Sequence, residues 1–282
     1  MKRAVYNLLA ILMIIPSMTG CARLALIAAP SLIPDMTQAF FEECDLELAE
    51  RSLPAQLKLL EGLLKNTPGQ RQLLTALCTG YTGYAMLFVE EEDPERASAL
   101  YLRARAYGLE AIGIESVNPR TISGRLDDIG NEGIAPLFWA TMAWNAWINL
   151  NLHKPAALGQ LNSAQECLER IMEIDPSYFY GSPYIMIGSM LAARPGVLGG
   201  DAARAKEYFQ KAMEVSSGEF LLAQYHFAKY YAVRVQDKEL FLELIKEVET
   251  APLDRLKEAC LINRATKKRM KGLEEKTEEL FY

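Results

Sequence analysis

Residues 203–213, Ala-Arg-Ala-Lys-Glu-Tyr-Phe-Gln-Lys-Ala-Met, carry the spacing that best indicates the fold class. Ala205, Phe209 and Ala212 stand at offsets of four and seven residues, which place them on one face of an α-helix. The two small side chains let a neighbouring helix approach closely, and the bulky ring between them fills the groove. The stretch therefore predicts a helix packed tightly against another helix.

The same spacing occurs at three earlier places in the chain. The triplets are Ala97, Tyr101 and Ala104; Ala164, Leu168 and Ile171; and, in a weaker form, Gln56, Leu60 and Leu63. Pro176 and Pro68 follow two of these starts by twelve residues, where a proline would close the helix. This is the pattern of the second helix of a tetratricopeptide repeat (TPR). The starts are 41, 67 and 41 residues apart, against about 34 in regular TPRs, so we expect an irregular array with insertions.

Turn signals divide the rest of the chain into helix-length pieces, and strand-like alternation is absent from the sequence. We therefore predict an all-α fold, an irregular TPR-like array of helical hairpins (an α-solenoid), in one domain over residues 35–282. Asp35, Asp93 and Asp201 are expected to be helix N-caps. We expect a solvated loop at the acidic residues 90–93, and a solvated amphipathic helix at residues 256–282, which include the basic residues 267–269.

The N-terminus has the order of a secretory signal peptide. Lys2 and Arg3 precede an apolar run, and small residues lead to Cys21. A cysteine at this place indicates a bacterial lipobox, in which acyl chains such as palmitate attach to Cys21; the alternative is an ordinary signal peptide with a chance cysteine. We predict a signal peptide at 1–20, a lipid-anchored tether at 21–34, and a periplasmic location. Ala22, where an aspartate would favour the inner membrane, makes the outer membrane the preferred anchor site.

Composition limits the partners and the cross-links. The chain carries 30 Lys and Arg against 36 Asp and Glu, a net charge of −6, which gives no electrostatic case for nucleic acid or an anionic membrane surface. Attachment to a membrane would have to come from the N-terminal lipid. Four further cysteines are scattered without short spacings: Cys44, Cys78, Cys167 and Cys260. We interpret them as small buried hydrophobic residues and leave a chance pair open.

The sequence offers no catalytic constellation. His153 precedes a proline in an expected turn, and His226 stands among aromatic residues on an expected helix, where a packed, hydrogen-bonded histidine is the usual case. Common nucleophile, phosphate-binding, dinucleotide and metal-binding motifs are missing from the sequence. We therefore predict a protein that is not an enzyme and that has no metal and no cofactor.

Aromatic residues give the candidate binding residues. One expected helix, residues 136–150, holds Trp139, Trp144 and Trp147, and a second segment holds Tyr180 and Tyr184. The simpler interpretation is packing between repeats; the functional one is an aromatic wall for an apolar or amphipathic ligand. Arg194 precedes Pro195 in a turn, where it would bond the carbonyls of a helix end or clamp a carboxylate.

Several spaced motifs carry a family resemblance over nearly the whole mature chain. They are Gly20-Cys21-Ala22-Arg23, residues 57–64 with Pro68, Gly80-Tyr81, residues 88–93, residues 103–109, Tyr180-Gly181-Ser182-Pro183 with Arg194-Pro195, residues 198–201 and Leu280-Phe281. With these motifs the chain resembles the T-component family of TRAP transporters, which are periplasmic TPR-like lipoproteins.

This resemblance implies an all-helical protomer with a channel, self-association as a homotrimer, and docking to the periplasmic substrate-binding protein of a TRAP transporter. That partner would supply a membrane permease that imports small, often organic-acid, solutes. The chain would then be an accessory protein that binds a hydrophobic or carboxylated small ligand. The alternative is a TPR lipoprotein scaffold for outer-membrane protein assembly or secretion.

Overall fold

The computed structural model describes residues 31–114, 117–196 and 199–281, so the predicted signal peptide, Cys21 and nearly all of the tether lie outside the described residues. The described residues are helical with no strand, which confirms the all-α prediction, whereas the TPR-like array remains a prediction. The elements are α3 (Leu32–Phe41), α4 (Leu46–Asn66), α5 (Arg71–Tyr84), η1 (Ala85–Val89), α6 (Pro94–Ala111), α7 (Pro119–Leu126), η2 (Asn131–Gly133), α8 (Ile134–Leu150), α9 (Pro155–Leu158), α10 (Leu161–Ile174), α11 (Tyr178–Ala193), α12 (Ala202–Val215), α13 (Leu222–His226), η4 (Phe227–Ala232), α14 (Val233–Val235), α15 (Lys238–Thr250), η5 (Lys257–Ala259), α16 (Cys260–Glu274) and α17 (Thr277–Leu280).

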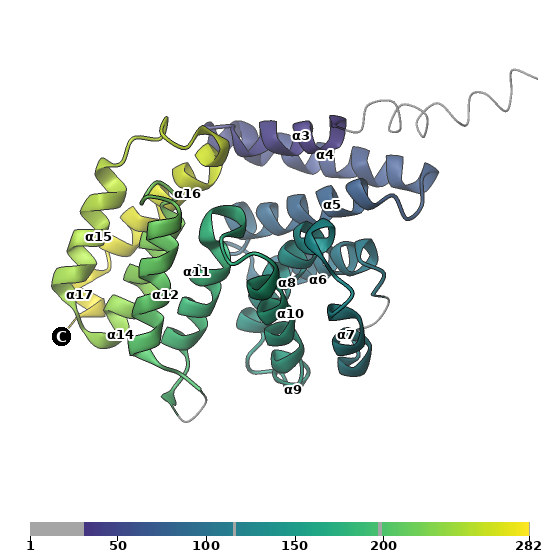
Figure 1. Ribbon diagram of the computed structural model, residues 1–282. Helices are drawn as coiled ribbons and strands as arrows, with labels where there is room; N and C mark the ends of the chain where they lie inside the picture. The colour runs from purple at the N-terminus through teal and green to yellow at the C-terminus, as the bar shows by residue number, and fades with distance from the viewer. Residues whose placement is uncertain (1–30, 115–116, 197–198, 282) are drawn as a thin grey trace, which may run out of the picture.

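Helix α6 is the centre of the first half of the molecule, where it packs against both α5 and α8 (Figure 1). Its predicted triplet, Ala97, Tyr101 and Ala104, has no exposed surface. One turn on, a Cβ at Gly108 would lie 2.7 Å from both Ala140 Cβ and Cys78 Sγ, so only glycine permits this helix approach.

The pairing of α11 with α12 forms the core of the second half. The triplet Ala205, Phe209 and Ala212 on α12 is fully buried, as its spacing indicates. The ring of Phe209 lies 3.2 Å from where a Cβ on Gly188 of α11 would stand, and it stacks on Phe227 of η4 with centroids 5.1 Å apart. Small residues on both helices therefore make room for one large ring.

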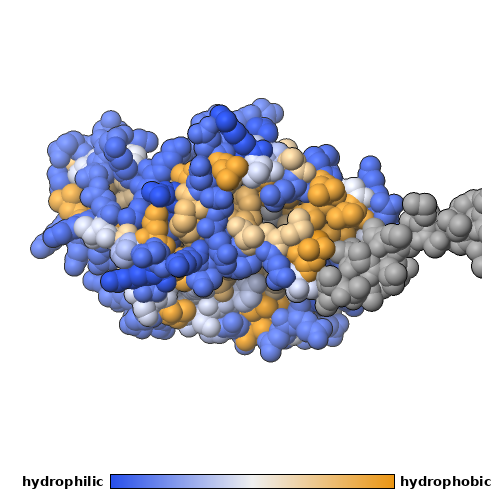
Figure 2. Space-filling model, turned by 90° about the horizontal axis from the view of Figure 1, so that it is seen from above, coloured by the Kyte–Doolittle hydropathy of each residue, from blue (hydrophilic) through white to orange (hydrophobic). Residues whose placement is uncertain are grey.

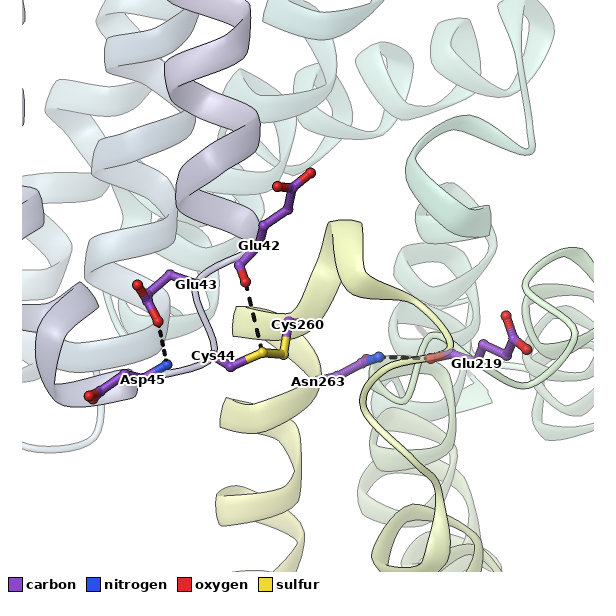
Figure 3. The surroundings of a disulfide bond; sticks show 7 residues. All are labelled: Glu42, Glu43, Cys44, Asp45, Glu219, Cys260 and Asn263. Atoms are coloured by element: carbon purple, nitrogen blue, oxygen red, sulfur yellow. Dashed lines mark hydrogen bonds between the residues drawn. A yellow bond between two sulfur atoms is a disulfide. The ribbon is translucent and has the colours of Figure 1, made fainter.

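An early and a late segment of the described chain meet. Helix α16 packs against α3 and α4, and Figure 1 shows it beside them at the top of the molecule. There Cys44 and Cys260 form a disulfide, with Cα atoms 5.2 Å apart and a sequence separation of 216 (Figure 3). The interpretation of these two cysteines as isolated hydrophobic residues is therefore wrong; it is right for Cys78 and Cys167, which are buried free thiols.

The helix caps agree with the sequence at two of three places. Asp93 accepts a hydrogen bond from the backbone N–H of Arg96, and Asp201 accepts one from that of Arg204, each at 3.0 Å. Asp35 is not a cap, because α3 begins at Leu32 and the aspartate lies inside its first turn. Pro34 does not prevent this, since a proline is tolerated in the first turn of a helix.

The C-terminal segment is less solvated than expected. Arg269 on α16 has a side chain only 14% exposed, donates to the carbonyl oxygen of Met86, and pairs with Glu91 at 3.3 Å. Met86 belongs to the π-helix η1, whose wider hydrogen-bond spacing disturbs the regular ladder. Glu90 is also not fully solvated, because it accepts a hydrogen bond from the Tyr101 hydroxyl. Arg269 thus links the basic run at 267–269 to the acidic run at 90–93, across the two halves of the molecule.

Within the described ranges, no helix combines the length and the apolar character that a bilayer crossing requires.

Candidate functional site

A cavity of about 400 Å³ lies between α3, α5, α8 and the start of α11. Figure 2 views the face that carries α3 and α4 and shows apolar residues exposed near the start of the described chain. The walls combine apolar and aromatic side chains with a polar rim, and the lining residues are Ile33, Pro34, Thr37, Gln38, Phe41, Arg71, Gln72, Thr75, Ala76, Thr79, Glu132, Ala135, Pro136, Trp139, Tyr178 and Phe179. This size and this mixture are typical of small-molecule sites.

Three aromatic rings from three helices form one wall of this cavity. Phe41, the last residue of α3, stacks on Trp139 of α8 with ring centroids 5.8 Å apart and planes 16° from parallel. Phe179 meets Trp139 edge-on at 5.0 Å and lies 5.4 Å from Phe41. Offset-stacked and edge-on contacts of this kind stabilise aromatic clusters beyond their burial. We call Phe41, Trp139 and Phe179 the aromatic wall.

The backbone beside the aromatic wall is strained. Phe179, Tyr180 and Gly181 have φ values of 45°, 61° and 77°, so three consecutive residues adopt the left-handed region. For the two residues with side chains this costs on the order of 1–3 kcal/mol each, and it persists only where the surroundings hold it. The aromatic wall holds the ring of Phe179, and Phe220 packs on Tyr180 with centroids 5.1 Å apart. This turn aims Phe179 into the cavity.

The rim carries a cation, Arg71, the first residue of α5. Its Nη2 donates to the backbone carbonyl of Glu132 at 2.7 Å, while its Nη1 lies 3.9 Å from the Glu132 carboxylate. Two rim hydroxyls donate along their own helices, Thr37 to the Ile33 carbonyl at 3.0 Å and Thr75 to the Arg71 carbonyl at 2.8 Å. Each hydroxyl keeps acceptor capacity at its oxygen.

A second, apolar cavity of about 40 Å³ lies on the other side of α3, against α4 and α5. It shares Ile33, Thr37, Phe41, Ala76 and Thr79 with the larger one. Its volume is about a tenth of that of the larger cavity, so we place the candidate site in the larger one. Because these shared residues belong to α3 and α5, both spaces lie against the same pair of helices.

The predicted binding residues do not share one site. Trp139 lines the cavity, and Tyr180 lies directly behind its wall. Trp144 is fully buried, and Arg105 lies over the rings of Trp144 and Trp147 at 4.9 and 5.5 Å. Tyr184 packs against Tyr208, 6.0 Å between centroids, and Arg194 reaches Gln165 at 3.4 Å in the turn after α11.

Sequence reasoning missed two of the three rings of the aromatic wall and the rim arginine. Phe179 stood in an aromatic-rich segment, but its left-handed backbone has no marker in the sequence. Phe41 and Arg71 carry no distinguishing spacing. They become recognisable only once α3 is seen to lie on α5 beside the start of α8.

The histidines match their interpretation. His226 is mostly buried and shares a hydrogen bond with the Ser189 hydroxyl, 2.8 Å from Nδ1. Burial and, to a smaller extent, the charges of Lys229 and Arg269 lower its pKa to about 3, so the ring is neutral near pH 7. His153 lies in an exposed turn. The described residues include no cluster of His, Cys, Asp and Glu suited to a metal ion.

Comparison with known proteins identifies relatives of this chain. The family model of the TRAP transporter T-component matches residues 42–281. An uncharacterized protein of Treponema pallidum (strain Nichols) is 28% identical over 199 residues, a match that covers 62% of this chain and 62% of that protein. The family is one of transport accessory proteins, and its members are components of a transport system at the membrane or in the periplasm. The chain therefore belongs to the TRAP transporter T-component family.

Proposed function

We propose that this protein is a lipid-anchored periplasmic accessory protein of a TRAP-type solute uptake system, which binds a periplasmic substrate-binding protein and a hydrophobic or carboxylated small ligand. The family match over residues 42–281 supports the transport role. The observation that supports a small ligand is the cavity of about 400 Å³ with its aromatic wall. Of the six ligand-binding residues predicted from the sequence, Trp139 is the one we assign to direct contact.

The remaining parts of the proposal concern assembly. Acyl chains on Cys21 would hold the protein at a membrane, with the outer membrane preferred, and a homotrimer of TPR-like protomers would present the docking surfaces for the substrate-binding protein. The protein would act by binding, without catalysis or a cofactor. Cys21→Ser should release it from the membrane fraction and abolish labelling with palmitate.

Affinity capture tests the central claim. The mature protein, immobilised through its C-terminus, is incubated with periplasmic extract from its own organism, and bound proteins are identified by mass spectrometry. Recovery of a TRAP substrate-binding protein is expected. The rival role, a scaffold for outer-membrane protein assembly or secretion, predicts recovery of assembly factors instead and a broad loss of outer-membrane proteins on gene deletion. A transport role predicts reduced uptake of one solute class.

A further inference from the structure

The lining of the cavity beside α3 combines two kinds of side chain. The aromatic wall is apolar, whereas Arg71 at the rim is the one basic residue among the side chains that line the cavity. We propose that this cavity binds a small amphipathic carboxylate, an acid with a ring-sized apolar body, and that Arg71 is the residue that recognises its carboxylate. This deepens the proposed function, on which it rests for the protein's role as a solute binder.

The guanidinium of Arg71 is oriented without being neutralised. The 2.7 Å hydrogen bond to the Glu132 carbonyl fixes its direction. The Glu132 carboxylate is a weak partner, because it lies 3.9 Å away and its side chain is 95% exposed, where water screens the attraction. A guanidinium has five N–H donors, more than these two contacts use, and its planar fork matches a carboxylate.

The loop that orients Arg71 is itself closely packed. A Cβ at Gly133 would lie 2.5 Å from Ile129 Cγ2 and 3.4 Å from Arg71 Nη2, so glycine lets the chain pass close to the guanidinium. The preceding carbonyl, that of Glu132, is therefore kept within hydrogen-bond distance of the Arg71 guanidinium. A positive group kept in place before a ligand arrives loses little freedom on binding, which favours affinity.

The aromatic part of the lining selects the body of the ligand. Phe41, Trp139 and Phe179 pack on one another, and the small part of their surface that lines the cavity is apolar and suits an aromatic or alicyclic group. Glu132 is the one acidic side chain among the lining residues, and it is exposed. A cationic ligand would therefore be repelled by Arg71 and would find no buried carboxylate to pair with. An apolar neutral ligand would fill the wall but leave the arginine without an anion.

Calorimetric titration of the mature protein with three matched probes tests this assignment. The probes are 1-naphthylacetate, its neutral amide 1-naphthylacetamide, and 1-naphthylmethylamine, at low ionic strength and pH 7. We expect the acid to bind at least about tenfold more tightly than the amide, and the amine least tightly. Arg71→Gln should remove the preference for the acid, Arg71→Lys should keep part of it, and Glu132→Gln should strengthen acid binding a few-fold.

Arg194→Gln is the matched control, since Arg194 lies away from the cavity, and it should change nothing. Thermal midpoints confirm that the variants fold. Equal affinity of acid and amide, tighter binding of the amine, an acid preference that survives Arg71→Gln, or no binding of the acid at millimolar concentration would each overturn the assignment. Failure to capture a substrate-binding protein, with intact acid binding, would instead refute the proposed function and leave this site standing.

Discussion

The two ends of helix α8 carry the same kind of side chain in different settings. Near its start, Trp139 stacks on Phe41 and faces the cavity. Near its end, the indole N–H of Trp144 donates to Gln160 at 2.9 Å, and Arg105 lies over the rings of Trp144 and Trp147. We call these the cavity end and the sealed end of α8.

The difference between the two ends comes from their neighbours. The sealed end is covered by Arg105 of α6, which packs along the helix, and by Gln160, which lies close in sequence. The cavity end faces α3 and the start of α11, which leave space between them. Aromatic content alone therefore does not mark a binding site; the geometry of the covering segments does.

The largest effects are expected from truncating one tryptophan at each end of α8. The variant at the sealed end should lose more stability, and the variant at the cavity end should lose binding. Trp144→Ala removes a fully buried ring from a filled site and should cost about 3–5 kcal/mol of unfolding free energy. Trp139→Ala, beside existing free volume, should fall at the lower end of this range, about 3 kcal/mol, because the neighbouring rings can relax into the cavity. Denaturant unfolding measures both.

Binding should show the reverse order. Trp139→Ala should abolish binding of the naphthyl probes, while Trp144→Phe, which keeps most of the buried ring volume and therefore folds, should bind them as the parent does. Equal losses of affinity in the two variants would contradict the distinction between the ends.

Removal of the disulfide should affect the cavity end more than the sealed end. Cys44 lies three residues beyond Phe41, so its bond to Cys260 fixes the chain where α3 leaves the aromatic wall. The double variant Cys44→Ser, Cys260→Ser should lose about 2–4 kcal/mol of unfolding free energy, since the cross-link closes a long segment of chain. Hydrogen exchange should then rise in α3 and in the start of α16, with α6 and the end of α8 little changed.

Reduction of the parent protein serves as the control for this variant. A reducing agent should reproduce the exchange pattern in the parent and should have no effect on the double variant, which lacks the cross-link. Uniform loosening of the whole chain would show that the disulfide stabilises the fold globally and does not hold α3 specifically.

The sequence predicts local features well and long-range ones poorly, for a physical reason. The triplets at Ala97 and Ala205 and the caps at Asp93 and Asp201 depend on helical periodicity and on hydrogen bonds within one turn, so spacing predicts them. The Cys44–Cys260 bond and the α3 cavity depend on how segments far apart in the sequence meet. Small angles between successive helices accumulate along the chain, and no single segment encodes their sum.

A substitution of Arg105 tests the sealed end with a smaller expected loss of stability. Burial lowers the pKa of this arginine to about 10, which indicates how far its charge is removed from water. Arg105→Met keeps much of the apolar stem but removes the contact with both rings and the 2.8 Å bond to Gln160, and should cost about 1–2 kcal/mol. Probe binding at the cavity end should be unchanged. A loss of affinity in this variant would show that the two ends are coupled through α8.

Acid should destabilise the cavity end and the sealed end of α8 together, because the group that titrates, His226, lies at neither end. His226 has a pKa of about 3 in the folded protein, whereas an unfolded histidine titrates near 6.5. The unfolded chain therefore takes up a proton first, so this contribution is complete above pH 6.5 and is lost as the pH falls from 6.5 towards 3. Between pH 7.5 and 5.5 the loss should be about 1 kcal/mol, and His226→Gln should remove that part of the pH dependence. Single-tryptophan variants that retain Trp139 or Trp144 differ in stability, but both should show the same shift of the unfolding midpoint between the two pH values, because protonation of His226, the last residue of α13, breaks its packing against Ser189 of α11 and destabilises one cooperative fold. A larger shift in the variant that retains Trp139 would mean that the cavity end unfolds on its own in acid, in which case α3 is no part of the cooperative fold.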